Sequence, residues 1–508
     1  MNVFTLRLTS FFRCVILFII VRYLTIHLHT FLSLERGNTL TTNKKKIPDT
    51  DQEKDYAQQK TTIMGTLPIP KLLAQFSIPA VIAMLVNAIY NIVDRIFIGN
   101  FVGENALAGL TISFPIMMII FAFAGLVGIG GSALMSIHFG RKDFDAVSNV
   151  FGNMLSLGSL ITMITLVTIF FNLDAILLLF GATQDILGYA TDYMNIILLG
   201  FIFQMWAFSL NGAVRTEGHP MLSMMTMLLS AITNIVLDYL FIVRFNWGVQ
   251  GAAIATISGQ FVGLLFLVRY YLSGNSALRF KRAYFIPKWS ILNEIVVIGF
   301  STFIAQLGTS VSMIFINRGL ALYGGVSAIT SMGAINSLFT LFIMPIMGLQ
   351  QGLQPIIGYN YGANSPERVK AALKLGLAVG TIFSTFVFIV LQLFPDFFVS
   401  MFLDAQSSTV SVAARGLQLF ILMLPLLSIN LLGIGFFQSI AKGRYAVVLG
   451  SLRQFVILLP VVIILPKFLG LTGVWLATPI ADGIAILLTI LALFKHFAEE
   501  PHLKETSA

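Results

Sequence analysis

The chain has 508 residues, of which 57% are hydrophobic and 10% are charged, and its formal net charge is +9. A soluble domain carries about 25% charged residues, so this composition excludes a soluble globular protein and indicates one that crosses a membrane several times. The basic residues lie in short polar segments, as the positive-inside rule predicts, and do not indicate nucleic-acid binding. The single cysteine, Cys14, excludes an intrachain disulfide.

Residues 1–63 form an N-terminal extension to which we assign no function. Residues 11–34 are apolar but are interrupted by Arg13 and Arg22, and a polar run follows at 43–60. Three interpretations compete: a thirteenth span, an uncleaved signal-like segment, or translated upstream sequence that is absent from the mature protein. We favour the third, because the chain from Met64 already resembles a complete start.

Twelve apolar segments follow, and each has the roughly 20 residues that a helix needs to cross a bilayer. They lie at 71–99, 105–137, 146–173, 185–212, 220–244, 248–273, 289–320, 326–358, 367–394, 409–439, 445–466 and 472–497. The longest polar interruption predicts a linker at 274–288 between a first bundle of six helices (64–273) and a second (289–497), with a tail at 498–508. The expected fold is an all-α membrane protein of two pseudo-symmetric six-helix bundles.

Alternate loops collect the basic residues, Arg141, Arg215, Arg279 and Arg368 among them. The positive-inside rule therefore places these loops, and both ends of the twelve-helix core, in the cytoplasm. None of the six histidines lies in the middle of a predicted span, so we expect no buried metal site of histidine or cysteine.

Two acids, Asp94 and Asp238, lie deep in apolar sequence of the first bundle. A carboxylate at the centre of a membrane helix costs about 2.5–3.5 kcal/mol even on the lenient insertion scale. Asn87 and Asn91 share a helical face with Asp94, and Asn234 shares one with Asp238. Carboxylate, amide and hydroxyl oxygens suit a proton or a hard cation such as Na⁺. A structural cluster of interhelical hydrogen bonds is the alternative.

Two further residues have open roles. Pro79 lies inside the first span, where it permits a bend that is either a conformational hinge or a static kink. Asp482 lies a few turns into the twelfth span, where the first bundle has Gln260, and it is a candidate for a cavity in the second bundle.

The two halves repeat at an offset of 222 residues, so GVQGAAIAT at 248–256 matches GLTGVWLAT at 470–478. Parallel repeats with six spans each are typical of alternating-access transporters. The acids are not repeated: Asp94 falls on Ile316, and Asp238 falls on Pro460 or Ile463. This asymmetry predicts an ion-coupling site in the first bundle alone.

The segment 68–116, beginning PIPKLLAQFSIPAV, resembles the opening of the MATE (multidrug and toxic compound extrusion) family, and RTEGHP, TNIVLDYLFI and GVQGAAIAT fit the family at the expected places. The resemblance covers about 64–497 and is closest to the bacterial multidrug-export branch of DinF-like and staphylococcal exporters. It implies export of cationic, amphiphilic drugs or dyes in exchange for H⁺ or Na⁺.

The resemblance also implies site residues. Its coupling set is Asp94, Asp238, Asn211, Asn234 and Thr256, its hinge is Pro79, and Tyr90 and Tyr193 match cavity tyrosines. From their positions in the sequence, we add Asn87, Asn91, Gln306 and Asp482 to the possible substrate cavity. The chain differs from the NorM-like branch, which has an acid midway along the seventh span. Gln306 is the nearest polar group here, which puts a coupling site in the second bundle in doubt.

We therefore expect a secondary multidrug antiporter of the bacterial inner membrane, a monomer in the lipid bilayer, with no cofactor and no enzymatic activity. A flippase for lipid-linked oligosaccharides shares the architecture, but its pyrophosphate ligand would require several Arg or Lys in the cavity. A membrane-embedded enzyme would require a nucleophile, metal set or phosphate motif within the spans, and none is found. A solute symporter remains an alternative.

Overall fold

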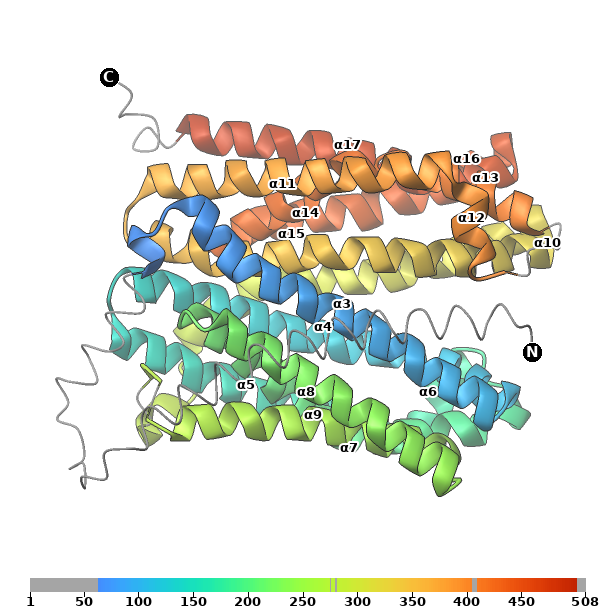
Figure 1. The fold of residues 1–508 in the computed structure, drawn as a ribbon, viewed down its shortest axis with the longest axis horizontal. Coiled ribbons are helices and arrows are strands. Elements are labelled where there is room, and N and C mark those ends of the chain that lie inside the picture. Colours follow the sequence, from blue (N-terminus) through green and yellow to red (C-terminus); the bar gives the residue numbers. More distant parts are fainter. Residues whose placement is uncertain (1–62, 275, 279–280, 404–408, 500–508) are drawn as a thin grey trace. The chain divides into compact units, whose positions relative to one another are not determined.

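A computed structural model describes residues 63–499, except for 275, 279–280 and 404–408. The predicted N-terminal extension lies outside the described residues, apart from residue 63. The described part is built from helices, as Figure 1 shows, and contains no strand. The predicted all-α class is therefore confirmed.

The six predicted spans of the first bundle are all present, and a short helix, α6, joins the third to the fourth. In chain order the elements are α3 (Ile69–Phe101), α4 (Glu104–Gly140), α5 (Phe144–Phe170), α6 (Leu173–Leu179), α7 (Gln184–Thr216), α8 (Pro220–Asp238) with the π-helical segment η1 (Tyr239–Arg244), and α9 (Gly248–Leu272). A short 3₁₀ helix, η2 (Arg282–Phe285), follows in the linker.

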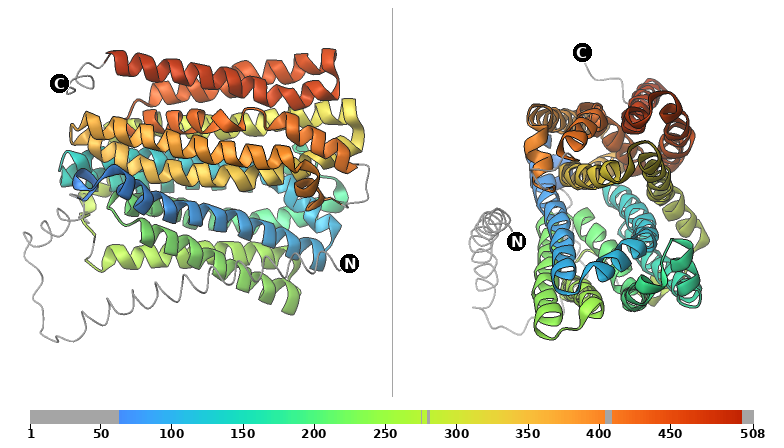
Figure 2. Two further views of the ribbon diagram at one scale, coloured as in Figure 1. Left: turned by 45° about the horizontal axis from the view of Figure 1, so that its top comes forward. Right: turned by 90° about the vertical axis from the view of Figure 1, so that its right-hand side faces the viewer.

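The second bundle contains the remaining spans. Its elements are α10 (Trp289–Gly362), α11 (Pro366–Leu393), α12 (Pro395–Ser400), α13 (Thr409–Phe420), α14 (Leu424–Ser439), α15 (Gly443–Ser451), the π-helical segment η3 (Leu452–Leu458), α16 (Leu459–Leu469) and α17 (Leu471–Glu499). In the end-on view of Figure 2, the blue-to-green helices of the first bundle and the yellow-to-red helices of the second form two groups.

Three spans of the second bundle differ in detail from the prediction. The seventh and eighth spans join without a loop in α10, and only Gly325, with φ 63° and ψ −157°, interrupts the helical backbone. Glycine adopts this conformation without a steric penalty. The tenth span is bent by 51° between α13 and α14. With α10 counted as two spans and the bent pair as one, the described residues contain the predicted twelve.

The bundles pack against each other mainly through α3 and α4 of the first and α10 of the second. We call the end that carries Arg141, the segment 273–288 and Arg368 the linker end, and the other the opposite end. Glycines permit the helices of the two bundles to approach closely in the half of the molecule nearer the linker end. A Cβ on Gly299 would overlap the carbonyl oxygen of Leu126, and a Cβ on Gly348 would lie 2.6 Å from Cα of Val81.

Hydrogen bonds between the bundles also lie in the linker-end half. Gln354 donates from Nε2 to the carbonyl oxygen of Ile129 at 3.1 Å. Near the helix ends, Asn360 donates to the carbonyl oxygen of Met64 at 3.1 Å, and Arg368 donates to that of Leu67 at 2.7 Å. The bundles are therefore closed against each other at the linker end in this conformation.

We expect Gly299→Ala to destabilise this closed packing, because the added Cβ has no room against the Leu126 carbonyl. Overpacking of this kind costs about 1–3 kcal/mol. The thermal unfolding temperature of the purified protein should fall.

Gly333→Ala is the matched control. Gly333 lies in the same helix, α10, and a Cβ there would meet no atom within 4 Å. This change should be neutral or stabilise the helix by about 0.5–1 kcal/mol. Equal unfolding temperatures for the two variants would contradict the inferred role of Gly299.

Candidate functional site

Asp94 and Asp238 lie in helices that pack against each other, α3 and α8. Their side chains are buried: Asp94 is 8% exposed and Asp238 is 0% exposed. The two carboxyl groups are near enough to interact electrostatically. Asp238 is the last residue of α8, and the π-helical segment η1 begins immediately after it. Such π-helical turns are rare and occur frequently at functional sites.

The polar atoms of these acids lack hydrogen-bond partners. Both carboxyl oxygens of Asp238, Oδ1 of Asp94 and Oδ1 of Asn234 are buried and accept no hydrogen bond from the described residues. Buried polar groups are nearly always paired in native proteins, so each exception requires an explanation. Four unpaired oxygens from two adjacent helices form a set of acceptors without a donor.

Close packing of α9 against α8 holds Asn234 in position. A Cβ on Gly259 would lie 2.6 Å from the carbonyl oxygen of Ser230 and 3.2 Å from Cβ of Asn234, so only glycine fits here. Across the same contact, Nδ2 of Asn234 donates to the hydroxyl of Thr256 at 3.4 Å. The amide nitrogen is thereby turned toward α9, and the amide oxygen remains unpaired.

The two predicted cavity tyrosines of the first bundle differ in exposure. Tyr193 on α7 is 2% exposed and lies beside Thr256, within electrostatic range of Asp94 and Asp238. Tyr90 on α3 is half-buried and lies within range of the same acids. Tyr193 is therefore a fully buried neighbour of the acid cluster, whereas Tyr90 is partly exposed.

Other polar residues of α3 are directed differently from Asp94. Asn91 is exposed, and its Nδ2 donates to the carbonyl oxygen of Asn87 at 2.7 Å, one helical turn earlier. The guanidinium of Arg95 lies over the ring of Phe114, 5.3 Å from its centroid. Pro79 is buried, and α3 continues through it as a helix.

Asn211, a predicted member of the coupling set, bonds to Ser223 and not to the two acids. It lies near the linker end of α7, where Nδ2 donates to the Ser223 carbonyl oxygen and Oδ1 accepts from the Ser223 hydroxyl. Ser223 precedes Asp238 by fifteen residues along α8, which is roughly 22 Å at the helical rise of about 1.5 Å per residue. The Asn211 side chain therefore stabilises the α7–α8 turn.

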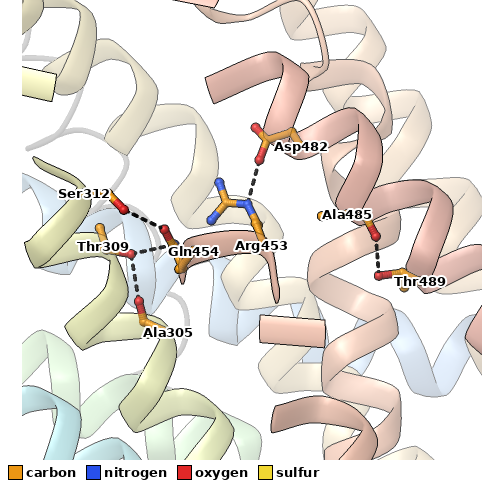
Figure 3. A network of polar contacts seen from close by, with 8 residues as sticks. All are labelled: Ala305, Thr309, Ser312, Arg453, Gln454, Asp482, Ala485 and Thr489. Carbon is orange, nitrogen blue, oxygen red and sulfur yellow. Dashed lines mark hydrogen bonds and ion pairs between the residues drawn. The ribbon is translucent and has the colours of Figure 1, made fainter. Parts of the chain in front are cut away.

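In the second bundle, Asp482 of α17 has a partner that the sequence prediction missed. Nε of Arg453, in the π-helical segment η3, donates to Oδ1 of Asp482 at 2.6 Å, as Figure 3 shows. The side chains of the two residues are 22% and 6% exposed, respectively. The buried acid of the second bundle is thus already paired with a cation, unlike the two buried acids of the first. The available signal was a basic residue, Arg453, in the middle of the eleventh predicted span and an acid, Asp482, in the twelfth.

Next to this pair, Gln454 connects η3 to α10. Its Nε2 donates to the Thr309 hydroxyl at 3.0 Å, and its Oε1 accepts from the Ser312 hydroxyl at 3.3 Å (Figure 3). Gln306, the polar group predicted for this region, is half-buried on the same helix. The polar groups of the second bundle are therefore largely paired with one another.

The unpaired oxygens of the first bundle can bind a proton or a hard cation. Two neighbouring carboxylates without donors repel each other, and either ligand would neutralise part of their charge. Carboxylate and amide oxygens also suit Na⁺. The described residues contain no group of three or more His, Cys, Asp or Glu side chains arranged to hold a metal ion, so Asn234 and Thr256 would have to complete a cation site.

Comparison with known proteins agrees with this architecture. The family profile described as MatE matches the chain twice, at residues 79–240 and 298–464, once in each bundle. The multidrug export protein MepA of Staphylococcus haemolyticus is 30% identical over 435 residues, which are 84% of this chain and 93% of MepA.

Solved structures show the same likeness. The MATE multidrug transporter DinF-BH is 39% identical with a TM-score of 0.80, and the match covers 86% of this chain and 97% of DinF-BH. An outward-facing multidrug resistance MATE family transporter is 25% identical with a TM-score of 0.82. The match covers 88% of this chain and 99% of that transporter. The chain therefore belongs to the MATE family, and it is a multi-pass membrane protein.

Proposed function

We propose that the protein is a secondary active multidrug exporter that exchanges cationic, amphiphilic compounds for H⁺ or Na⁺. The observation that carries this proposal is the cluster of buried oxygens without donors on Asp94, Asp238 and Asn234. Its relatives MepA and DinF-BH are named as multidrug transporters, which supports the substrate class. The protein acts as a transporter and not as an enzyme, and it functions as a monomer.

The linker end faces the cytoplasm of a bacterial cell, and the protein lies in the inner membrane. The basic residues of the linker-end loops support this orientation. With the first bundle at 64–273, the linker at 274–288 and the second bundle at 289–497, the conformation described above is closed to the cytoplasm.

The coupling ion binds at Asp94 and Asp238 when it enters from outside. Asn234 and Thr256 complete the site, and Tyr193 shields it from behind. A bound H⁺ or Na⁺ removes negative charge that would otherwise attract a cationic drug, so the ion and the drug compete. This competition is the basis of exchange.

Helix α3 transmits the change between the ion site and the bundle contact. Asp94 lies in its opposite-end half, whereas Val81 contacts Gly348 of the second bundle in its linker-end half. Pro79 lies in the linker-end half of α3, close to Val81. Proline lacks an N–H, so the backbone hydrogen bond to the carbonyl oxygen of Gln75 is missing. We infer that Pro79 is the hinge about which α3 rearranges.

Polar and aromatic residues that are at least partly exposed contact the drug. Tyr90, Asn87 and Asn91 contribute from α3, and Gln306 contributes from the second bundle. Asp482 is less suited to bind a cationic drug, because Arg453 already occupies its carboxylate.

We expect Asp94→Asn and Asp238→Asn to abolish ion-coupled efflux, because the amide cannot exchange a proton and is a weaker ligand for Na⁺. Dye export from proteoliposomes with an imposed gradient should fall to the level of protein-free vesicles. Asp185→Asn, at an exposed acid in the first turn of α7, should export at the wild-type rate. Wild-type export by both buried-acid variants would overturn the assignment.

The same two variants should unfold at the wild-type temperature or above. Each replaces a buried carboxylate that lacks a donor with a neutral group of the same shape, which reduces the cost of burial. If the acids served only as structural hydrogen-bond acceptors, the unfolding temperature would fall instead. Thermal unfolding of the purified variants separates these two roles.

The identity of the coupling ion can be tested with two separate gradients. We expect either an inward proton gradient or an inward Na⁺ gradient to drive dye export by the wild type, and Asp238→Asn to remove the response. Dye fluorescence in proteoliposomes reports both. If neither gradient drives export, the protein is not an antiporter for H⁺ or Na⁺.

Breaking the Arg453–Asp482 pair should destabilise the protein without removing ion coupling. Arg453→Gln leaves Asp482 buried without its cation, and the loss of one partner of a buried pair costs about 3 kcal/mol or more. The double variant Arg453→Gln/Asp482→Asn should recover most of the unfolding temperature and should retain gradient-driven export. A double variant that is stable but uncoupled would place coupling in the second bundle as well.

A further inference from the structure

A cavity of about 560 Å³ lies between the two bundles at the linker end. Its walls come from the end of α4 and the start of α5 in the first bundle, and from the start of α10 and the α14–α15 turn in the second. Small-molecule sites commonly occupy cavities of about 300–1,000 Å³. The cavity is separate from the acid cluster, which lies in the opposite-end half of α3.

Basic residues of both bundles line this cavity. His138 and Arg141 belong to the first bundle, and Lys288 and Lys442 belong to the second. The one acid among the lining residues is Glu294. Three permanent cations and a histidine therefore surround a space that holds a single carboxylate, and this charge favours an anionic ligand.

The polar contacts of Lys288, Arg141 and His138 leave capacity for a ligand, whereas Lys442 has partners of its own. Lys288 donates from Nζ to Oδ1 of Asn149 at 2.8 Å, which is a neutral partner. Nζ of Lys442 lies 3.1 Å from Nδ1 of His496. Within the described part of the chain, the guanidinium of Arg141 has no hydrogen bond or ion pair, and Nδ1 of His138 is buried without a partner.

The acids at the start of α5 accept hydrogen bonds outside the cavity, although Asp143 lies within electrostatic range of His138. The side chain of Asp143 accepts a hydrogen bond from the backbone N–H of Ala146 at 2.9 Å, as the N-cap of α5. Oδ1 of Asp145 accepts from the hydroxyl of Tyr284 in the linker at 2.8 Å. Neither acid lines the cavity.

We propose that this cavity binds a phosphate-bearing anion, which is the headgroup of an anionic phospholipid or a free phosphate. Lys and Arg form short, charge-assisted hydrogen bonds to phosphate oxygens. Basic pockets between transmembrane helices on the cytoplasmic side bind anionic headgroups. Arg141 follows the last residue of α4 directly, and Lys288 directly precedes α10, so the bases lie at the helix ends, where headgroups reside.

This position distinguishes a bound regulator from a transported lipid. Pyrophosphate cargo would require basic residues deeper along the spans, whereas the lining bases occupy the ends of helices. An anion held by Arg141 of the first bundle and Lys442 of the second stabilises their contact at the linker end. If the protein functions by alternating access, as proposed above, the anion favours the conformation that is closed to the cytoplasm.

The test compares two double variants of equal charge. Arg141→Gln/Lys442→Gln removes two lining bases, and Lys142→Gln/Arg444→Gln removes two bases of the same turns that do not line the cavity. The full chain is placed in phosphatidylcholine nanodiscs with increasing phosphatidylglycerol, and native mass spectrometry measures the retained anionic lipid. Each base near the surface contributes about 1 kcal/mol, so we expect retention to weaken roughly tenfold or more in the lining variant and little in the control.

A second arm identifies the source of the phosphate. Inorganic phosphate is titrated into phosphatidylcholine-only nanodiscs, and the thermal unfolding temperature is measured. A rise that the lining variant loses indicates a free anion, and lipid retention without such a rise indicates a headgroup. Equal retention by both double variants, or no effect of either ligand on the wild type, would overturn the proposal.

Two features keep the test decisive. Binding and unfolding are measured without transport, so a failure of the proposed antiport would not affect the result. If the double variant folds poorly, Arg141→Gln is compared with Lys142→Gln, because both side chains are exposed and neither change removes a hydrogen bond found among the described residues.

Discussion

The cost of burying Asp94 and Asp238 without hydrogen-bond donors is the constraint on which the site depends. Two neighbouring carboxyl groups in an apolar bundle are stable only if a proton or a cation neutralises part of their charge. Close packing at Gly259 prevents a simple relaxation, because it fixes α9 against α8 and directs the amide nitrogen of Asn234 toward Thr256. The fold thus holds four buried oxygens that lack a hydrogen-bond donor among the described residues.

Much of the fold could be predicted from the sequence, because membrane spans are defined by length and apolar composition. The twelve spans and their division into two bundles required no knowledge of contacts. Local backbone changes could not be predicted in this way. The break at Gly325, the bend between α13 and α14 and the π-helical segments η1 and η3 leave hydrophobicity unchanged. They depend on how the helices pack against one another, and the number of apolar residues in a span carries no information about that packing.

The sequence predicts those site residues whose burial in a membrane costs the most free energy. Asp94, Asp238 and Asn234 were predicted because burying acids and amides in lipid costs free energy, and the structure places their unpaired oxygens on two adjacent helices. Their partners could not be assigned, because the partner of a polar group depends on helix rotation and depth. Asn211 bonds to Ser223 across the next turn, about four helical turns along α8 from Asp238, although the resemblance to the family grouped it with the acids. Arg453 was missed for the same reason, because its role is visible only when η3 packs beside Asp482.

The two bundles therefore use the same scaffold in different electrostatic states. In the second bundle, Arg453 is a built-in cation, so Asp482 has no need of an ion from solution. In the first, the acids lack such a partner, and their helix α3 also carries the contact between Val81 and Gly348. A change of charge at Asp94 therefore acts on the same helix that contacts the second bundle near the linker end. Pro79 lies two residues from Val81, the residue that makes this contact. If Asp94 and Asp238 bind the coupling ion, as proposed, α3 therefore carries both the ion site and a contact that closes the linker end.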